Sequence, residues 1–458
     1  MSENKMGVMS EGKLLLNMSL PMMISMFVQA LYNIVDSIFV AKISQDALTA
    51  VSLAFPMQSL MIAVSAGTGV GVNALISRSL GERKRKKANT IAVNGIFIYF
   101  LSYIVIAAIG ALFSRPFYAM MIEPGQEAIA ELGVQYLTIV MCGSFGIFAQ
   151  MIFERILQST GRTVLTMISQ TLGAVINLIL DPILIFGLFG LPAMGVAGAA
   201  LATIAGQIIA GIVAFIFNIK FNTDIRISFK GFRPDGKIIK SIYQIAIPSI
   251  IMQSIGSFMT TGMNKILLGL DNDGTGAAVF GVYFKLQSFF FMPVFGLNNG
   301  MIPILAYNFG AGNKKRMMNT VKYACMIGFG ACAVGFALFE FFPVPLLKLF
   351  DASDNMLTIG THALKVIAFH YLAAWFCIII GSLFQAVGKA TYTMYTSVAR
   401  QLVILLPAAY ILAKIGGMNL IWWSLPIAEI MSLIMTLIFL RSTMKFINQE
   451  IAKFGGVL

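Results

Sequence analysis

Two carboxylates stand within long apolar stretches of the first half of the chain. Asp36 lies in residues 14–41 and Asp181 lies in residues 163–187, and both stretches are predominantly apolar. Inside a membrane, an ionisable side chain costs about 2.5–3.5 kcal/mol on insertion scales unless it is paired, neutralised or hydrated. The two acids therefore favour a site that binds a small cation, which could be a metal ion or a proton.

Neutral polar side chains accompany both acids at helical spacing. Tyr32 precedes Asp36 by four residues and Asn177 precedes Asp181 by four, so each pair shares one helix face. Thr203 falls in the next apolar run, and a rise of 1.5 Å per residue places all five side chains roughly 8–15 Å below the outer surface. This set of oxygen atoms suits either sodium or a proton. The sequence leaves that choice open, with sodium predicted at Asp36, Asn177 and Asp181.

Some of these polar groups also have a plainer structural explanation. Asp181 directly precedes Pro182 and could cap a bend in its helix, because proline removes a backbone hydrogen bond. Thr203 could donate to a carbonyl of its own helix, as threonines in membrane helices often do. The pair of acids favours the cation site, whereas Thr203 alone does not separate the two explanations.

The composition predicts an all-α membrane protein. Of the 458 residues, 58% are hydrophobic and only 11% are charged, against about 25% charged in soluble domains. Apolar runs of at least about 20 residues predict membrane-spanning helices rather than a β-barrel. The twelve predicted spans are residues 14–41, 47–76, 89–113, 131–158, 163–187, 194–219, 239–270, 275–308, 319–342, 360–386, 391–414 and 419–441.

The basic residues predict the orientation in the membrane. With the N-terminus placed inside, the inner loops and tails hold 23 lysines and arginines and the outer loops hold 4. This bias predicts a multi-pass protein of the cell (inner) membrane with both termini in the cytoplasm. The polar first 13 residues predict that the first helix is retained and not cleaved. The net charge of +13 does not predict a nucleic-acid partner, because the basic residues lie in short loops between apolar runs.

The chain repeats itself at a shift of 227 residues. LQSTGRTVLTM (157–167) resembles FQAVGKATYTM (384–394), and Pro21 and Pro248 share the same shift. The repeat predicts two pseudo-symmetric six-helix bundles, an N-lobe (1–220) and a C-lobe (239–458), joined by a cytoplasmic linker (221–238). Two such bundles in a monomer suggest alternating access. Bends are predicted at prolines within the runs, namely Pro21, Pro56, Pro182, Pro248, Pro293, Pro303, Pro407 and Pro426.

The second bundle carries different charges from the first. Arg400 and Glu429 could form an ion pair, and His370 could titrate near neutral pH or simply pack with a hydrogen bond. We predict a substrate cavity lined by methionines, phenylalanines, Gln29 and Asp36, to which Lys285 and His370 could contribute. Glu154 and Arg155 lie near the cytoplasmic end of the fourth predicted span, where we expect a solvated rim rather than a gate.

These features together resemble the multidrug and toxic compound extrusion (MATE) family over essentially the full length. The residues that match the family's N-lobe cation site, in the form seen in its archaeal and DinF-like branches, are Tyr32, Asp36, Asn177, Asp181 and Thr203, with Pro21 at the bend of helix 1. The acids implicated in helices 7 and 10 of the NorM-like branch are missing here. The resemblance implies the twelve-helix MATE fold of the MOP superfamily. It also implies an antiporter that exports cationic or amphipathic drugs in exchange for sodium or protons.

Two other classes of function compete with this one. A lipid-linked oligosaccharide flippase of the same superfamily would favour an arginine-rich central cavity, whereas the first bundle here has an acidic interior. An enzyme is not predicted, because the chain shows no phosphate-binding loop, no His/Cys metal set and no catalytic triad. No cofactor is expected beyond the coupling ion, so transport is expected to be driven by an ion gradient.

Overall fold

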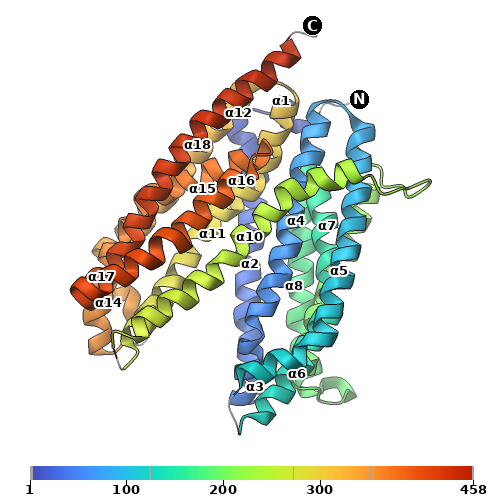
Figure 1. Cartoon of the computed structure of the whole chain (residues 1–458). Helices are drawn as coiled ribbons and strands as arrows, with labels where there is room; N and C mark the ends of the chain where they lie inside the picture. The colour runs from blue at the N-terminus through green and yellow to red at the C-terminus, as the bar shows by residue number, and fades with distance from the viewer. Residues whose placement is uncertain (1–3, 123–124, 272, 351, 456–458) are drawn as a thin grey trace. The chain divides into compact units, whose positions relative to one another are not determined.

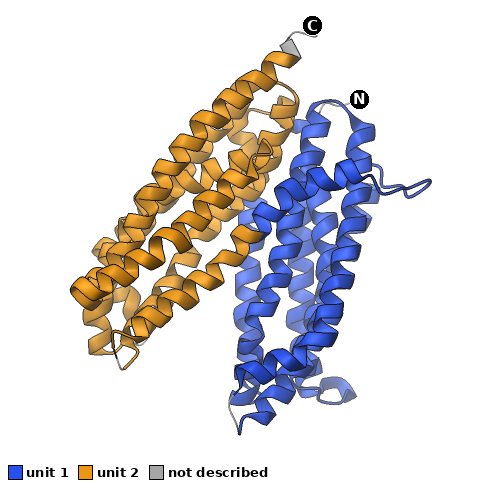
Figure 2. Ribbon diagram, viewed as in Figure 1, with its two compact units in different colours: residues 1–5, 20–250 blue, residues 6–19, 251–458 orange. Residues whose placement is uncertain are grey.

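The computed structural model describes residues 4–122, 125–271, 273–350 and 352–455. Throughout these ranges every regular element is a helix (Figure 1). The chain forms two compact units, one of residues 1–5 and 20–250 and the other of residues 6–19 and 251–458 (Figure 2). The all-α membrane class predicted from composition is confirmed.

The first unit contains the helices that follow one another through the first half of the chain. A short helix, α1 (Lys5–Val8), precedes them, and residues 6–19 of α1 and α2 belong to the second unit. The helices are α2 (Glu11–Ala41), α3 (Gln45–Leu53), α4 (Phe55–Gly81), α5 (Arg85–Met121), α6 (Glu127–Cys142), α7 (Phe145–Ser159), α8 (Thr163–Phe186) and α9 (Val196–Lys220), with a single 3₁₀ turn, η1 (Leu188–Gly190), between the last two.

The second unit has an aromatic core. Tyr371 packs on Phe291 in a stacked arrangement with ring centroids 5.4 Å apart and on Phe339 in an edge-to-face arrangement at 5.3 Å.

The second half of the chain supplies the elements of this unit. They are α10 (Gly236–Leu268), α11 (Thr275–Gly310), α12 (Lys314–Phe341), α13 (Pro343–Lys348), α14 (Asp354–Ala368), α15 (Tyr371–Ala386), α16 (Ala390–Val398), the π-helical turn η2 (Ala399–Ile404), α17 (Leu405–Leu420), the 3₁₀ turn η3 (Ile421–Trp423) and α18 (Ser424–Gly455).

The candidate spans agree with the twelve predicted spans once two bent helix pairs are each counted as one span and one overlong segment is divided. In the described part of the chain, nine helical segments are long and apolar enough to cross a membrane, or eleven if each of two bent pairs is one span. One segment, Ala390–Lys453, has 64 residues, about three times the length that a bilayer needs. Its backbone leaves the helical conformation at Gly416 and Gly417, and α17 then packs against α18. Division at this point gives the twelve predicted spans.

Two bends between helices lie at positions without proline. The chain turns by 40° between α6 and α7, at Gly143 and Ser144, and by 51° between α14 and α15, at Phe369 and His370. In contrast, α2 continues as one helix through Pro21, and α10 continues through Pro248. The predicted bend at Pro21 therefore stays a prediction, and the two bends at the helix breaks were not foreseen.

Two long helices divide their residues between the units close to these prolines. Residues 6–19 of α1 and α2 pack in the second unit, where Asn308 donates to the Met6 carbonyl at 3.1 Å. The first part of α10 packs in the first unit, since a Cβ on Gly71 would meet the Ile242 carbonyl at 2.6 Å. The contact-defined units therefore differ from the predicted lobes at residues 6–19 and 239–250. Long-range packing, which sequence does not reveal, assigns those residues.

Close packing of α8 on α9 depends on two glycines. A Cβ on Gly206 would lie 2.6 Å from the Gly173 carbonyl oxygen and 3.2 Å from the Asn177 Cβ. We expect Gly206→Ala to force the two helices apart and to lower the free energy of unfolding by about 1–3 kcal/mol. The measurement is thermal unfolding of the detergent-solubilised protein. In the control Gly330→Ala, the new Cβ meets nothing within 4 Å, so stability should be unchanged or slightly raised. Equal unfolding temperatures for both variants would contradict the packing argument.

Candidate functional site

The first unit encloses a cavity of about 500 Å³ whose wall includes one face of α2. The contributing positions recur at three- and four-residue intervals, as one face of a helix requires. They are Ser25, Gln29, Tyr32, Asn33, Asp36, Ser37 and Val40. The i, i+4 relation predicted for Tyr32 and Asp36 therefore turns both side chains toward one space.

Several other helices supply the remaining wall, which is rich in amides and hydroxyls. The polar lining residues outside α2 are Ser52, Gln58, Tyr136, Gln150, Gln170, Asn177, Thr203 and Gln207. Five residues singled out from the sequence thus line one cavity, namely Gln29, Tyr32, Asp36, Asn177 and Thr203. Asp181 is fully buried, with 0% of its surface exposed, and does not form part of the wall.

The turn between α8 and α9 sets which residues of the two helices meet. Gly187 ends α8 in the left-handed conformation, with φ 73°, which glycine adopts without a steric penalty. The returning chain is held by hydrogen bonds from the Met194 amide to the Leu184 carbonyl at 3.0 Å and from the Gly195 amide to the Ile185 carbonyl at 3.1 Å. This fixed register places the residues in the last three helical turns of α8 opposite residues of α9.

Asn177 joins the buried acid of α8 to α9. Its amide nitrogen lies 3.4 Å from Asp181 Oδ1 and 3.3 Å from Thr203 Oγ1. When the amide is turned by 180°, the nitrogen donates to Asp181 Oδ2 at 3.3 Å and the oxygen accepts from the Thr203 backbone N–H at 3.1 Å. We adopt the turned orientation because it gives both amide atoms suitable partners.

The two carboxyl groups are brought together from α2 and α8. Asp36 and Asp181 are within side-chain hydrogen-bonding contact. Asp36 Oδ1 is buried and has no hydrogen-bond partner in the described ranges. Ionised carboxylates only accept hydrogen bonds, so two of them can remain in contact only with a positive charge between them. The arrangement is suited to hold one shared proton or one small cation, with Tyr32 beside it.

Sequence reasoning missed another part of this site. The Tyr136 hydroxyl lies within electrostatic range of Asp36 and Tyr32, and it accepts a hydrogen bond from Gln58 Nε2 at 2.9 Å. Neither residue is ionised or part of a recognisable motif, so no local pattern distinguishes them from other polar residues in apolar helices. They add an oriented phenol and amide to the wall around the acids.

The solvated rim expected at Glu154 and Arg155 is wrong. Both side chains are buried, with 0% and 8% of their surface exposed. The Glu154 carboxylate accepts from Gln150 at 3.0 Å, from Gln170 at 2.6 Å and from the Ser169 hydroxyl at 3.2 Å. Gln150 and Gln170 are cavity residues, so their nitrogens are held by Glu154 and their amide oxygens remain available as acceptors.

We expect Glu154→Leu to destabilise the protein, because the amides of Gln150 and Gln170 would lose their acceptor. A buried donor left without a partner costs about 1–3 kcal/mol, and two such donors are affected. The loss should appear as a lower free energy of unfolding of the purified protein. Glu131→Leu is the matched control, because Glu131 is exposed on α6. A Glu154→Leu variant as stable as this control would contradict the assigned role.

The polar residues singled out in the second half lie in the second unit. Arg400 and Glu429 form the ion pair that their sequence positions allow, with Nη1 and Oε2 3.0 Å apart. His370 is buried beside Tyr371, and its Nδ1 lies 2.7 Å from the Ile367 carbonyl. The ammonium of Lys285 lies 5.9 Å from the centre of the Phe350 ring. The substrate-cavity role predicted for Lys285 and His370 stays a prediction.

A polar cavity with paired acids inside a multi-span helical protein is the arrangement expected of a membrane transporter. The MatE family model matches the chain twice, over residues 21–183 and 248–411. The chain therefore belongs to the MATE family, whose members are transporters and not enzymes. The two matches begin 227 residues apart, and this confirms the internal repeat.

The relatives agree with this assignment over nearly the whole chain. "Multidrug export protein MepA" of Staphylococcus haemolyticus is 27% identical over 91% of this chain and 90% of its own. "FAD transporter" of Shewanella oneidensis is 26% identical over 92% of both chains. A solved structure described as an outward-facing conformation of a multidrug resistance MATE family transporter of the MOP superfamily is 25% identical. It has a TM-score of 0.89 and covers 98% of this chain and 99% of its own. These relatives do not favour the flippase alternative.

Proposed function

We propose that this protein is a cation-coupled antiporter that exports cationic or amphipathic organic compounds across the cell membrane by alternating access. The observation that carries the proposal is the contact between Asp36 and Asp181 beside a cavity lined by Asp36 itself. One coupling ion, sodium or a proton, occupies the space between the two carboxyls. Asn177, Thr203 and Tyr32 complete its surroundings.

Exchange follows from competition for negative charge. When the carboxyls hold the coupling ion, their charge is partly neutralised and the cavity attracts an organic cation less strongly. When the ion leaves, Asp36 presents an uncompensated charge to the cavity, and a cationic substrate stabilises it. Loading of the ion and loading of the substrate therefore oppose each other. Such opposition is what an antiporter needs, and no further cofactor is required.

The orientation follows from the loops. The 23 to 4 excess of basic residues on one side supports cytoplasmic termini in the cell membrane. We propose that the protein works as a monomer, because both repeats of the transporter lie in one chain.

The test uses the purified protein in liposomes loaded with ethidium, a cationic dye. Sodium and proton gradients are imposed separately, and the initial rate of dye movement is recorded by fluorescence. We expect one of the two gradients to accelerate transport. We expect no transport of FAD, because a phosphate-bearing anion would be repelled by the acidic cavity. Equal rates with and without either gradient would overturn the proposed coupling, and transport of FAD in place of the dye would overturn the proposed substrate class.

A further inference from the structure

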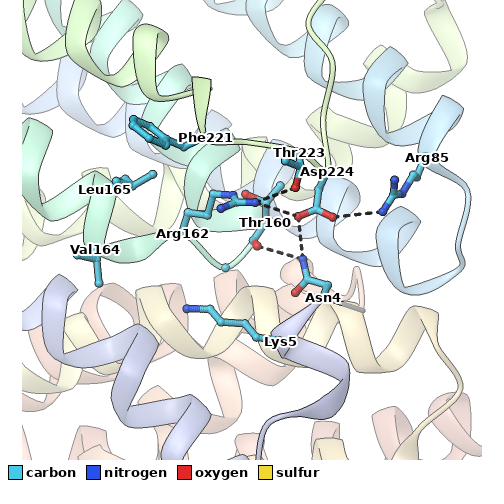
Figure 3. Close-up of a pocket in the computed structure, with 11 residues that line it drawn as sticks. Asn4, Lys5, Arg85, Thr160, Arg162, Val164, Leu165, Phe221, Thr223 and Asp224 are labelled. Atoms are coloured by element: carbon cyan, nitrogen blue, oxygen red, sulfur yellow. Dashed lines mark hydrogen bonds and ion pairs between the residues drawn. The ribbon is translucent and has the colours of Figure 1, made fainter. Parts of the chain in front are cut away.

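A second pocket, the basic pocket, lies in the first unit at the ends of several candidate membrane spans (Figure 3). It has a volume of about 640 Å³. Arg85 begins α5, Arg162 immediately precedes α8, and Phe221 immediately follows α9. Because α5, α8 and α9 are all candidate spans, the pocket is expected at the level where a membrane meets water.

The residues that line this pocket carry an excess of positive charge. Three are basic, Lys5, Arg85 and Arg162, and one is acidic, Asp224. The net charge of the lining residues is therefore +2. The first turn of α8, with Val164 and Leu165, also lines the pocket, and the positive end of a helix dipole adds to the attraction for an anion.

Asp224 holds the two guanidinium groups loosely. Its carboxylate oxygens lie 3.6 Å from Arg85 Nη2 and 3.8 Å from Arg162 Nη2, which is beyond normal hydrogen-bonding distance. Asn4 donates to the same carboxylate at 3.2 Å, and Arg162 Nη2 donates to the Thr223 hydroxyl at 3.0 Å (Figure 3). Asp224 thus lies near both guanidinium groups without a hydrogen bond of normal length to either.

Two further observations concern Arg162 and Lys5. Arg162 Nε is buried and has no hydrogen-bond partner within the described residues. Burial and the positive charge of Arg162 hold the pKa of Lys5 below its ordinary value. An anion placed beside Arg162 Nε would supply that acceptor and would offset the net positive charge of the lining residues.

We propose that the basic pocket binds the phosphate group of an anionic phospholipid. Arginine recognises phosphate with two parallel hydrogen bonds, and Arg162 and Arg85 supply the two guanidinium groups, with Lys5 adding a third charge. Apolar side chains stand beside them, since Val164 is 41% exposed and Phe221 is 50% exposed. A lipid uses both features, because its phosphate meets the cations while its acyl chains contact Phe221 and Val164. A free phosphate ion would use only the first feature.

The test is native mass spectrometry of the full-length protein in detergent, with phosphatidylglycerol or phosphatidylcholine added. We expect the protein to retain phosphatidylglycerol in preference. Each positive charge near a membrane surface contributes about 1 kcal/mol of attraction, which is roughly fivefold in affinity. Lys5→Gln and Arg162→Gln should therefore each weaken phosphatidylglycerol binding roughly fivefold, and Arg162→Lys should weaken it less.

The matched control is the double variant Lys237→Gln/Lys240→Gln, which removes two charges from exposed positions outside the pocket. Binding by this variant should equal that of the parent. An equal loss in this control would show diffuse attraction and overturn the proposal, as would full binding by Lys5→Gln and Arg162→Gln. If Arg162→Gln fails to fold, as judged by its unfolding temperature, Lys5→Gln alone decides the outcome.

A second arm separates lipid from free anion. Inorganic phosphate is added at the same ionic strength as a chloride control. We expect phosphate to leave phosphatidylglycerol bound, because it makes no contact with Phe221 or Val164. Displacement of the lipid by millimolar phosphate, but not by chloride, would overturn the assignment to a lipid.

Discussion

Asp36→Asn is expected to abolish most ion-driven export. The substitution keeps the shape of the side chain and removes its charge, so the contact with Asp181 no longer needs a cation between two acids. A hydrogen bond to a charged group contributes about 1.5–3 kcal/mol, which predicts a fall in the initial rate of gradient-driven dye transport of roughly ten- to 150-fold. Asp181→Asn should have a similar effect, because it removes the other half of the same site.

The double variant gives the sharper result. If Asp36 and Asp181 hold one shared ion, the double Asn variant should be hardly worse than either single variant, since the ion is already lost. Asp46→Asn is the matched control, because Asp46 is an exposed acid on α3 of the same unit. Correctly folded Asp36→Asn that transports dye as fast as the parent under the same gradient would exclude the coupling role.

Arg400→Met is expected to cause a large loss of stability. The variant leaves Glu429 with 3% of its surface exposed and without its partner at 3.0 Å. Removal of one member of a buried ion pair costs about 3–5 kcal/mol, because the remaining charge is neither hydrated nor paired. The quantity to measure is the free energy of unfolding of the detergent-solubilised protein.

The double variant Arg400→Met/Glu429→Leu should recover most of that loss, because no unpaired charge remains. Lys453→Met is the comparison for an exposed pair. It breaks the contact between Lys453 and Glu450, in which the lysine side chain is 71% exposed, and should cost under about 1 kcal/mol. A double variant less stable than Arg400→Met would show that the pair does more than balance charge.

Much of the fold could be predicted because a membrane restricts the backbone to few choices. A span needs about 20 apolar residues, and its polar backbone groups must be satisfied within the helix. This rule located α8 and α9 to within a few residues. It could not locate the breaks at Gly143–Ser144 and Phe369–His370 or the π-helical turn that contains Arg400, because the mean hydropathy of a whole span does not show where its helix breaks.

The site shows the same division between local and long-range information. Helical spacing alone puts Tyr32 and Asp36 on one face of α2, and Asn177 and Asp181 on one face of α8. Nothing in the spacing identifies Tyr136 as a neighbour of Asp36, or Glu154 as the acceptor for two cavity amides. Within an apolar helix, the lipid-facing and core-facing sides have similar composition, so polarity does not reveal which side meets another helix.

The sequence by itself determined that this chain is a repeated, all-helical membrane protein with acids in its first half, because apolar length, loop charge and helical period are local properties. Only the tertiary structure decided that Asp36 meets Asp181, that Glu154 is buried, and that residues 6–19 pack in the second unit. Those contacts join residues far apart in the chain. They depend on the register and close packing of helices, such as α8 on α9, which the order of apolar residues does not record.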